Sequence, residues 1–282
     1  MKISCIALDL DRTTLNSQGR LSEANKKAIE LAVKNGIHVV IASGRALNSL
    51  PREVCGIGGV QYAVTSNGAA IYDLHTRKCL KQYKLTADSV RRIVELTKEK
   101  GVAFEAFING KPYAWKPYVE DPVRFGATVS AVPYVQTTRQ PVENMLEFLE
   151  EHIGELDCLD IVVKGEEKKQ EIWAELRREI EDIYITSSIR QLLEISYKDC
   201  GKHSGVKFLL EYLGLDAREL AAFGDGDNDA DMLRFAGVGI AMGNASPECK
   251  RAADLVTLSN DEDGVAHEIC RLLYAADHHE NV

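Results

Sequence analysis

The N-terminal segment is the feature that most restricts how this chain can fold. Residues 3–8 form a short apolar stretch typical of a buried strand, and Asp9 and Asp11 follow it directly. Because side chains alternate along a strand, the two aspartates can leave its end on the same side. Two carboxylates that close repel each other unless a cation or a shared proton relieves the repulsion. Aspartate is also common in turns, so this pair alone leaves a polar turn and a functional site equally open.

The segments that follow predict a parallel α/β sheet. An amphipathic helix is expected over residues 23–34, with Ser22 as its N-cap and Gly36 after its end, and residues 37–42 form the next apolar strand. Near the other end of the chain, residues 220–223 form a further strand. Strands that alternate with helices build parallel sheets, which bind ligands at the carboxyl ends of their strands. The sheet is therefore expected to be assembled from both ends of the sequence.

The middle of the chain has a different pattern of expected helices and strands. Between about residues 84 and 190, the expected helices and strands lack the parallel repeat, and an irregular stretch containing Pro and Gly lies among them. We interpret this part as a separate α+β domain inserted into the first. The prediction is a core domain made of residues 1–83 and 191–282, with a cap domain over residues 84–190.

Composition excludes several classes of protein. With 282 residues, 45% hydrophobic and 27% charged, the chain has an ordinary globular composition and is long enough for two domains. Its net charge of −9 argues against a general binder of nucleic acids or membrane surfaces. The seven cysteines are scattered without C-x-x-C spacing, and we find neither a signal-peptide pattern nor a bilayer-spanning stretch. We expect a cytoplasmic protein with reduced thiols and with no nucleic-acid or membrane partner.

A dense acidic cluster follows the strand predicted at residues 220–223. Four aspartates occupy every second position from Asp225 to Asp231. An EF-hand loop is excluded, because Ala230 and Ala236 stand where that motif needs glycine and glutamate. Helix N-termini also favour acids, but four aspartates exceed what capping needs. Carboxylates at a strand end suit Mg²⁺, which uses a few of them and keeps its other positions for water or phosphate oxygens.

Two nucleotide-binding motifs are absent. The glycines at positions 56, 58 and 59 are followed by Gln61 where the third glycine of the dinucleotide fingerprint belongs. They also do not lie between a strand and a helix, as that fingerprint requires. A Walker phosphate-binding loop is missing as well.

Four short motifs occur in the order found in the haloacid dehalogenase-like phosphohydrolases. They are Asp9-Leu-Asp11-Arg-Thr-Thr-Leu15, Ser43-Gly44-Arg45, Lys202 and Gly224-Asp225-Gly-Asp-Asn228-Asp229. The chain resembles the Cof-type subfamily in particular, and the flanking segments 236–245, 250–254 and 262–265 strengthen the likeness. The resemblance implies an α/β protein whose Rossmann-like parallel sheet core carries an inserted α+β cap domain.

The resemblance also implies a role for each motif residue. Asp9 would attack phosphorus and carry an aspartyl-phosphate, while Asp11 would protonate the leaving alcohol and then activate water. Mg²⁺ would be held by Asp9, the main-chain carbonyl of Asp11, Asp225 and, directly or through water, Asp229. The phosphoryl oxygens would be bound by Leu10, Ser43, Gly44, Lys202 and Asn228.

These roles predict a Mg²⁺-dependent phosphatase for small organic phosphomonoesters, with sugar phosphates as the leading class and a small phosphorylated metabolite as partner. The cap would exclude water and select the leaving group. A phosphotransferase or sugar-phosphate mutase, and a non-catalytic phosphate-binding protein, remain as alternatives. A receiver-type signalling domain is disfavoured, because its phosphorylated aspartate follows the third strand of a smaller domain. We expect a monomer or a homodimer.

Three positions need separate attention. Arg12 replaces the glycine that usually follows the second aspartate. If that position needs a positive φ, the side chain costs about 1–2 kcal/mol; we favour the alternative that the backbone tolerates Arg12 and its guanidinium points toward the cap and an anionic substrate. His203 replaces the usual glycine after Lys202, and we expect it at the surface of a helix start. Asn67 could orient Asp11 or the substrate, or could simply form a turn.

Overall fold

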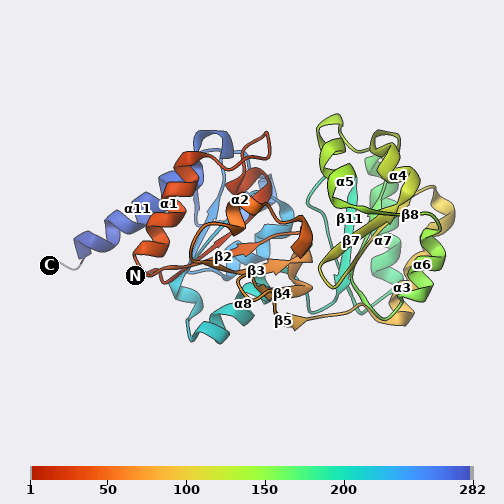
Figure 1. Ribbon diagram of the computed structural model, residues 1–282, viewed down its shortest axis with the longest axis horizontal. Helices are drawn as coiled ribbons and strands as arrows, with labels where there is room; N and C mark the ends of the chain where they lie inside the picture. Colours follow the sequence, from red (N-terminus) through yellow and green to blue (C-terminus); the bar gives the residue numbers. More distant parts are fainter. Residues whose placement is uncertain (1, 280–282) are drawn as a thin grey trace. The chain divides into compact units, whose positions relative to one another are not determined.

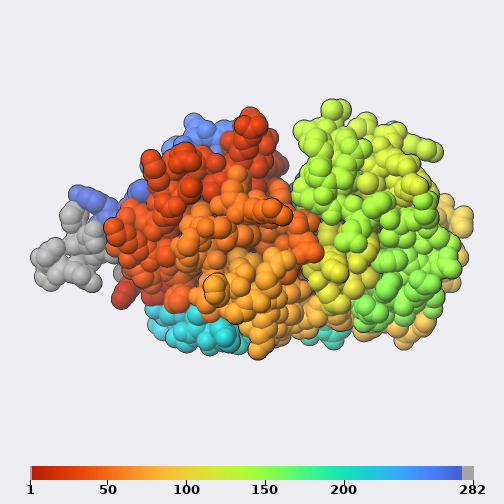
Figure 2. All heavy atoms as spheres, in the orientation of Figure 1, coloured from red at the N-terminus to blue at the C-terminus, as the bar shows by residue number. Residues whose placement is uncertain are grey.

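Two sheets organise the chain, and each is the centre of its own unit (Figure 1). The structure is a computed structural model that describes residues 2–279. The core unit comprises Met1–Gly44, Leu50–Lys81 and Gly201–Val282, and the inserted unit comprises Arg45–Ser49 and Gln82–Cys200. Figure 2 shows red and orange atoms from the N-terminal part of the core unit bordering cyan and blue atoms from its C-terminal part.

The core sheet has eight strands in the order β14-β13-β12-β1-β2-β3-β4-β5. They are β1 (Cys5–Leu8), β2 (His38–Ala42), β3 (Val60–Thr65), β4 (Ala70–Asp73), β5 (Cys79–Gln82), β12 (Leu220–Gly224), β13 (Val238–Ala241) and β14 (Leu255–Val256). The strands from β14 to β3 in this order run parallel, whereas β4 is antiparallel to β3. All four residues of β1 are buried, so the sheet is covered on both faces there, which explains the unbroken apolar run.

Helices flank this sheet in the same unit. They are α1 (Glu23–Lys34), α2 (Arg52–Cys55), α8 (Lys202–Leu213), α9 (Ala230–Phe235), α10 (Pro247–Ala252) and α11 (Gly264–His279). Helix α1 begins as predicted, because the Ser22 hydroxyl accepts a hydrogen bond from the Asn25 amide at 3.1 Å. Helices α1 and α11 pack side by side, which joins the two ends of the sequence (Figure 1).

The inserted unit is built on a six-stranded sheet in the order β10-β11-β9-β6-β7-β8. Its strands are β6 (Ala103–Ile108), β7 (Lys111–Trp115), β8 (Gln140–Val142), β9 (Leu156–Val162), β10 (Ile183–Thr186) and β11 (Leu192–Tyr197). Its helices are α3 (Ala87–Thr97), α4 (Lys116–Glu120), α5 (Val132–Thr138), α6 (Met145–Glu151) and α7 (Glu166–Glu179). The pairing is antiparallel except between β7 and β8.

Apolar side chains attach helices to both faces of this second sheet. Ile93 of α3 and Leu176 of α7 share a buried cluster with Leu159 of β9. Tyr118 of α4 shares a second cluster with Val162, which points to the opposite face because side chains alternate along the strand. Among the helices that the structure describes, none is both long enough and apolar enough to cross a membrane.

The predicted fold class is confirmed, since a parallel α/β core carries an inserted α+β sheet. The inserted unit ends at Cys200 rather than at residue 190, because β11 pairs with β9 and β10 and not with the core sheet. The stretch expected to be irregular contains helices α4 and α5. Pro117 and Pro133 stand in the first turns of these helices, where a missing N–H costs nothing.

Candidate active site

The motif residues lie at the carboxyl ends of neighbouring parallel strands. Asp9 follows β1, Ser43 follows β2 and Asp225 follows β12. The register brings these ends together, because Leu8 of β1 is paired with Phe223 of β12. The Asp9 amide extends this pairing by donating to the Phe223 carbonyl at 3.1 Å. The parallel topology therefore gathers residues that are far apart in the sequence.

Three buried carboxylates converge at this edge. Asp9, Asp225 and Asp229 each offer an oxygen, and these oxygens lie within 4.8 Å of one another. The three residues are only 5%, 6% and 1% exposed. Such a donor set fits Mg²⁺, which prefers carboxylate oxygens. Within residues 2–274, whose side chains the structure describes, no other acidic, histidine or cysteine residues form a group with this geometry.

Asp11 is placed differently from Asp9. It lies in the turn Leu10–Thr14 and is exposed, and its carboxylate is not part of the buried group. The two aspartates of the first motif therefore differ in environment, one buried among charges and one open to solvent. The proposed contact between a metal and the Asp11 carbonyl stays a prediction.

Lys202 holds two of the buried carboxylates together. Its Nζ donates to Asp9 Oδ1 at 2.7 Å and to Asp229 Oδ1 at 2.6 Å. Burial by itself would lower the pKa of this lysine, but Asp229 and Asp9 outweigh that effect and raise the pKa above its usual value. Lys202 is therefore a permanently charged cation inside the site.

The carboxylates resist simultaneous ionisation. Burial raises the pKa of Asp9, and the nearby Asp229 and Asp225 raise it further, whereas Lys202 acts in the opposite direction. Burial likewise raises the pKa of Asp225 to about 7, with Asp229 as the second cause and Arg12 opposing. Raised carboxyl pKa values in a cluster of this kind mark a place where an added cation is stabilising.

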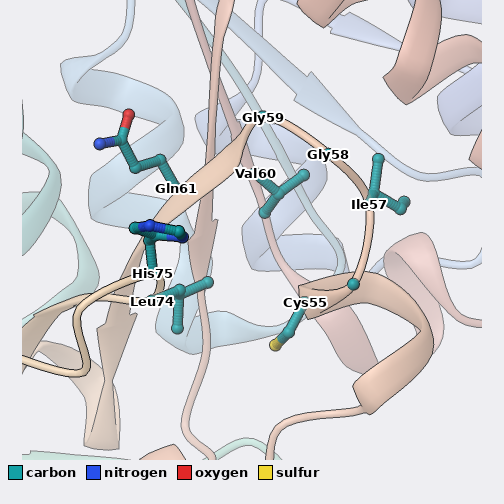
Figure 3. A pocket seen from close by; sticks show the side chains of 9 residues that line it. Cys55, Ile57, Gly58, Gly59, Val60, Gln61, Leu74 and His75 are labelled. Atoms are coloured by element: carbon teal, nitrogen blue, oxygen red, sulfur yellow. The ribbon is translucent and has the colours of Figure 1, made fainter.

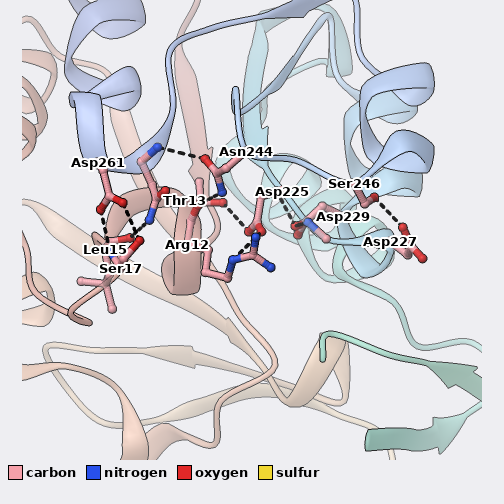
Figure 4. A network of polar contacts seen from close by, with 12 residues as sticks. Arg12, Thr13, Leu15, Ser17, Asp225, Asp227, Asp229, Asn244, Ser246 and Asp261 are labelled. Atoms are coloured by element: carbon pink, nitrogen blue, oxygen red, sulfur yellow. Dashed lines mark hydrogen bonds and ion pairs between the residues drawn. The ribbon is translucent and has the colours of Figure 1, made fainter. Parts of the chain in front are cut away.

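Asp229 also shapes the loop after β12. Its Oδ2 accepts hydrogen bonds from the amides of Asp225 at 3.0 Å and Gly226 at 2.9 Å. The neighbouring Asp227 is exposed and accepts a hydrogen bond from the Ser246 hydroxyl at 2.5 Å (Figure 4). The acidic run therefore contains carboxylates that form the site and at least one, Asp227, that lies on the surface.

Two threonines of the first motif contact the site, although no role was predicted for them. Thr13 Oγ1 donates to Asp225 Oδ1 at 3.0 Å, and Thr14 Oγ1 donates to the Asp9 carbonyl at 2.5 Å. Both side chains are fully buried. The signal was present in the sequence, since both threonines belong to the motif that begins at Asp9, but their partners become visible only in the fold.

Arg12 departs from its prediction. Its φ of 62° and ψ of 10° lie in the left-handed region, so the expectation that the backbone accommodates arginine without strain is wrong. A side chain in this conformation costs about 1–2 kcal/mol. Its Nε lies 3.8 Å from Asp225 Oδ2, so the guanidinium is directed at a buried carboxylate of its own unit (Figure 4).

Asn67 connects the segments that were predicted to bind phosphate. Its Oδ1 accepts from Asn228 Nδ2 at 3.0 Å, its amide donates to the Ser43 carbonyl at 3.1 Å, and its carbonyl accepts from the Gly201 amide at 2.8 Å. Its φ of 51° is one that asparagine tolerates better than most residues. Asn67 thus forms a turn and also orients Asn228, a role that motif reasoning left out of the site.

The remaining predicted phosphate contacts lie next to this network. Ser43 is 1% exposed, and Gly44 follows it in a half-buried position. The side chain of Leu10 is fully buried, so only its main chain could meet a ligand. Contacts of these three residues with phosphate stay predictions.

His203 lies at the start of α8, as expected, but is half-buried rather than on the open surface. Burial lowers the pKa of its imidazole. Its Nδ1 is buried and has no hydrogen-bond partner among the described residues. The imidazole is therefore neutral at pH 7, and its position gives it no assigned task.

A hollow of about 460 Å³ lies elsewhere in the core unit (Figure 3). Cys55, Ile57, Val60, Leu74 and His75 are among the residues that line it. Val60 begins β3, so the hollow is at the amino ends of the parallel strands, opposite to the carboxyl ends that carry the acidic residues. It shares no residue with the predicted site.

Comparisons with known proteins agree with this geometry. The sequence pattern of the haloacid dehalogenase-like hydrolase family matches residues 6–269. "Phosphatase YwpJ" of Bacillus subtilis is 31% identical over 95% of this chain and 99% of its own. A second B. subtilis protein, "5-amino-6-(5-phospho-D-ribitylamino)uracil phosphatase YcsE", is 28% identical over 95% of this chain and 94% of its own. The solved structure of a haloacid dehalogenase-like hydrolase from B. subtilis superposes with a TM-score of 0.82 at 28% identity, covering 95% and 99% of the two chains.

Proposed function

Because the chain belongs to the haloacid dehalogenase-like hydrolases and is a phosphatase of that family, we propose that it hydrolyses small phosphomonoesters through an aspartyl-phosphate on Asp9. The observation that carries the proposal is the convergence of Asp9, Asp225 and Asp229 around Lys202. A polar turn after a strand needs neither a buried lysine nor three carboxylates in contact range.

The first step transfers the phosphoryl group to the protein. A carboxylate oxygen of Asp9 bonds to phosphorus as the bond from phosphorus to the leaving alcohol breaks. Asp11 gives its proton to that leaving oxygen, which its exposed position allows. Lys202 fixes the Asp9 carboxylate through the 2.7 Å hydrogen bond and places a positive charge beside the transferred group.

The second step returns the enzyme to its starting state. Asp11, now ionised, takes a proton from water as the water oxygen bonds to phosphorus. The bond between phosphorus and Asp9 breaks, which releases inorganic phosphate and restores the carboxylate. We further propose that Ser43, Gly44, Asn228 and the main chain of Leu10 bind the phosphoryl oxygens, with Asn67 holding the Asn228 amide in place.

We propose Mg²⁺ as the cofactor, held by Asp9, Asp225, Asp229 and the Asp11 carbonyl. When bound, it would offset the repulsion between the carboxylates and the incoming phosphate. The burial of the three carboxylates and the raised pKa values of Asp9 and Asp225 support a cation at this place.

The proposed substrates are small polyhydroxylated phosphomonoesters, with sugar phosphates as the leading class. The relative named for a phosphoribitylamino compound supports this class, because its substrate is the phosphate ester of a polyol chain. A net charge of −9 makes long-range attraction of an anion weak, so recognition falls to local groups such as Lys202. We also infer a cytoplasmic location, which the scattered free cysteines favour.

Hydrolysis of p-nitrophenyl phosphate tests the proposal. We expect Mg²⁺-dependent release of phosphate by the wild type, and a loss of at least about a thousandfold in Asp9→Asn. Asp227→Asn is the matched control, because it removes an exposed carboxylate of the same acidic run that is not part of the buried group. Full activity in Asp9→Asn would refute the mechanism.

A panel of phosphorylated metabolites, compared by kcat/KM, would then identify the substrate. Adding a second sugar as acceptor distinguishes the alternatives. A phosphatase releases inorganic phosphate in its presence, whereas a phosphotransferase or a mutase produces a new sugar phosphate.

A further inference from the structure

Arg12 is held beside the site at a cost to the backbone. Its φ of 62° is in a region that side chains rarely adopt, and Asn244 Nδ2 fixes the turn by donating to the Arg12 carbonyl at 2.9 Å. Its guanidinium Nε lies 3.8 Å from Asp225 Oδ2, and the side chain is 59% exposed while that of Asp225 is 7% exposed. The arginine therefore reaches from solvent to a carboxylate buried in the predicted metal site (Figure 4).

Both oxygens of Asp225 face a donor or a cation of the first motif. Oδ1 accepts a hydrogen bond from Thr13 Oγ1 at 3.0 Å, and Oδ2 faces Arg12 Nε at 3.8 Å. The threonine contact is neutral, whereas the arginine contact brings a full positive charge. A divalent cation that approaches Asp225 therefore meets a charge of its own sign that is already in place.

The formal charges of the group show how strongly Arg12 opposes the binding of a cation. The three buried carboxylates carry three negative charges when ionised, and Lys202 offsets one of them. Arg12 offsets a second, so the formal charge that attracts a cation is −1, and it would be −2 with a neutral residue at position 12. Arg12 thus removes half of the net negative charge of the group.

We propose that Arg12 acts as a built-in counter-cation that weakens Mg²⁺ binding to the substrate-free protein and couples metal binding to the arrival of phosphate. The inference rests on the metal site of the proposed function. A phosphate dianion adds negative charge to the site and compensates Arg12, so metal and phosphate bind more tightly together than singly. Without the arginine charge, the metal binds well by itself and this coupling decreases.

The test compares variants that separate the charge of position 12 from its backbone strain. Arg12→Gln and Arg12→Lys both keep a long side chain at φ 62°, and only lysine keeps the charge. Arg12→Gly removes the charge and the strain together. The dissociation constant of Mg²⁺ alone is measured by calorimetry, first without and then with inorganic phosphate, so that catalytic activity is not the readout.

We expect Mg²⁺ to bind about tenfold more tightly to Arg12→Gln and Arg12→Gly than to the wild type, and Arg12→Lys to stay near the wild type. Phosphate should tighten Mg²⁺ binding more in the wild type than in Arg12→Gln. Equal Mg²⁺ affinity in the wild type and Arg12→Gln would overturn the inference. Tighter binding in Arg12→Gly alone would also overturn it, because strain and not charge would then be the cause.

Asp225→Ala distinguishes failure of this inference from failure of the proposed function. If Mg²⁺ binding is lost in Asp225→Ala but does not respond to the Arg12 variants, the metal site stands and the role of Arg12 is refuted. If Mg²⁺ binding persists in Asp225→Ala, the metal site itself is refuted, and the inference with it.

Discussion

Each of the two units contains a group of three buried carboxylates, and the two groups are built in contrasting ways. The core group is Asp9, Asp225 and Asp229, and the insert group is Glu105, Asp160 and Glu194. The core carboxylates come from loops at strand ends, and their oxygens converge within 4.8 Å. The insert carboxylates lie within strands, where Asp160 of β9 is paired with Glu105 of β6 and with Glu194 of β11. Convergence allows one cation to meet all members of a group, whereas a row across a sheet only places neighbours side by side.

The cations of the two groups differ in the same way. Lys202 is shared, since its Nζ donates to two carboxylates of the core group. Arg139 is committed to one carboxylate, because its Nε and Nη2 donate to Glu105 at 3.1 and 2.8 Å. Its guanidinium also lies 4.8 Å from the Tyr134 ring centroid. Burial of acidic side chains is therefore not enough to define a functional site. Converging carboxylate oxygens that share one cation indicate an active site, whereas a cation paired with a single carboxylate indicates a structural role.

Among the changes that test this comparison, the largest expected effect comes from removing the shared cation, Lys202. Lys202→Met should reduce kcat/KM at least about a hundredfold, because the transferred phosphoryl group loses a charged donor. The free energy of unfolding should also fall by about 3–5 kcal/mol, because the buried carboxylates of Asp9 and Asp229 lose their charged partner. Urea unfolding with and without Mg²⁺ checks the second effect. Mg²⁺ should restore part of the stability, and no restoration would mean that the core group does not receive a cation.

Removing Arg139, the cation of the insert group, should reduce the stability of the protein, and Mg²⁺ should not restore that loss. Arg139→Met leaves Glu105 buried without a charged partner, so the free energy of unfolding should fall by about 3–5 kcal/mol. The double variant Arg139→Met with Glu105→Met should recover most of that loss, because no lone charge remains. Urea unfolding measures both, and Mg²⁺ should change neither. Restoration of Arg139→Met by Mg²⁺ would remove the distinction between the groups.

A smaller effect is expected from the residue that orients a phosphate contact. Asn67→Gly removes the acceptor of Asn228 Nδ2 without straining the turn, and kcat/KM should fall about tenfold. A double-mutant cycle with Asn228→Ala checks the connection. The two changes should cost little more together than Asn228→Ala alone, and additive losses would show that Asn67 acts independently.

The smallest expected effect is a change in the pH dependence of stability. Burial raises the pKa of Asp160, and the neighbouring Glu194 and Glu105 raise it further, whereas the hydrogen bond from Cys158 and the charge of Arg139 oppose the rise. The folded protein therefore keeps a proton that the unfolded chain releases above its ordinary pKa of about 4. Stability from this group is present at low pH and falls as pH rises toward the folded pKa.

Asp160→Asn removes this titration. As pH rises above the ordinary aspartate pKa of about 4, the wild type should lose stability from this group, and the variant should show a flatter profile. Urea midpoints measured across that rise in pH provide the comparison. Identical pH profiles would show that Asp160 is ionised in the folded protein.

The sequence predicted more of the core group than of the insert group, and the reason is physical. Asp9, Ser43 and Asp225 belong to short motifs at strand ends, and parallel topology brings strand ends together whatever the sequence between them. The burial of Glu105 could not be predicted, because its partner Arg139 lies in a distant segment that the sequence showed only as irregular.

The backbone conformation near the motifs could not be predicted from the sequence either. The sequence named two options for Arg12, but only the fold reveals its φ of 62° and the 3.8 Å approach of its Nε to Asp225. Asn67 was weighed between a turn and an orienting residue. Its contact with Asn228 depends on two loops that are separated by most of the chain. Such contacts follow from packing and leave no pattern in the local sequence.

The most direct test of the central claim is to identify the phosphorylated residue during turnover. The protein is mixed with p-nitrophenyl phosphate and Mg²⁺, quenched in acid within one turnover, digested with pepsin and analysed by mass spectrometry. We predict the mass of one phosphoryl group on the peptide that contains Asp9, and fragmentation that places it on that carboxylate. A phosphoryl group on another residue, or inversion of configuration at a chiral phosphorus in the same reaction, would contradict the account.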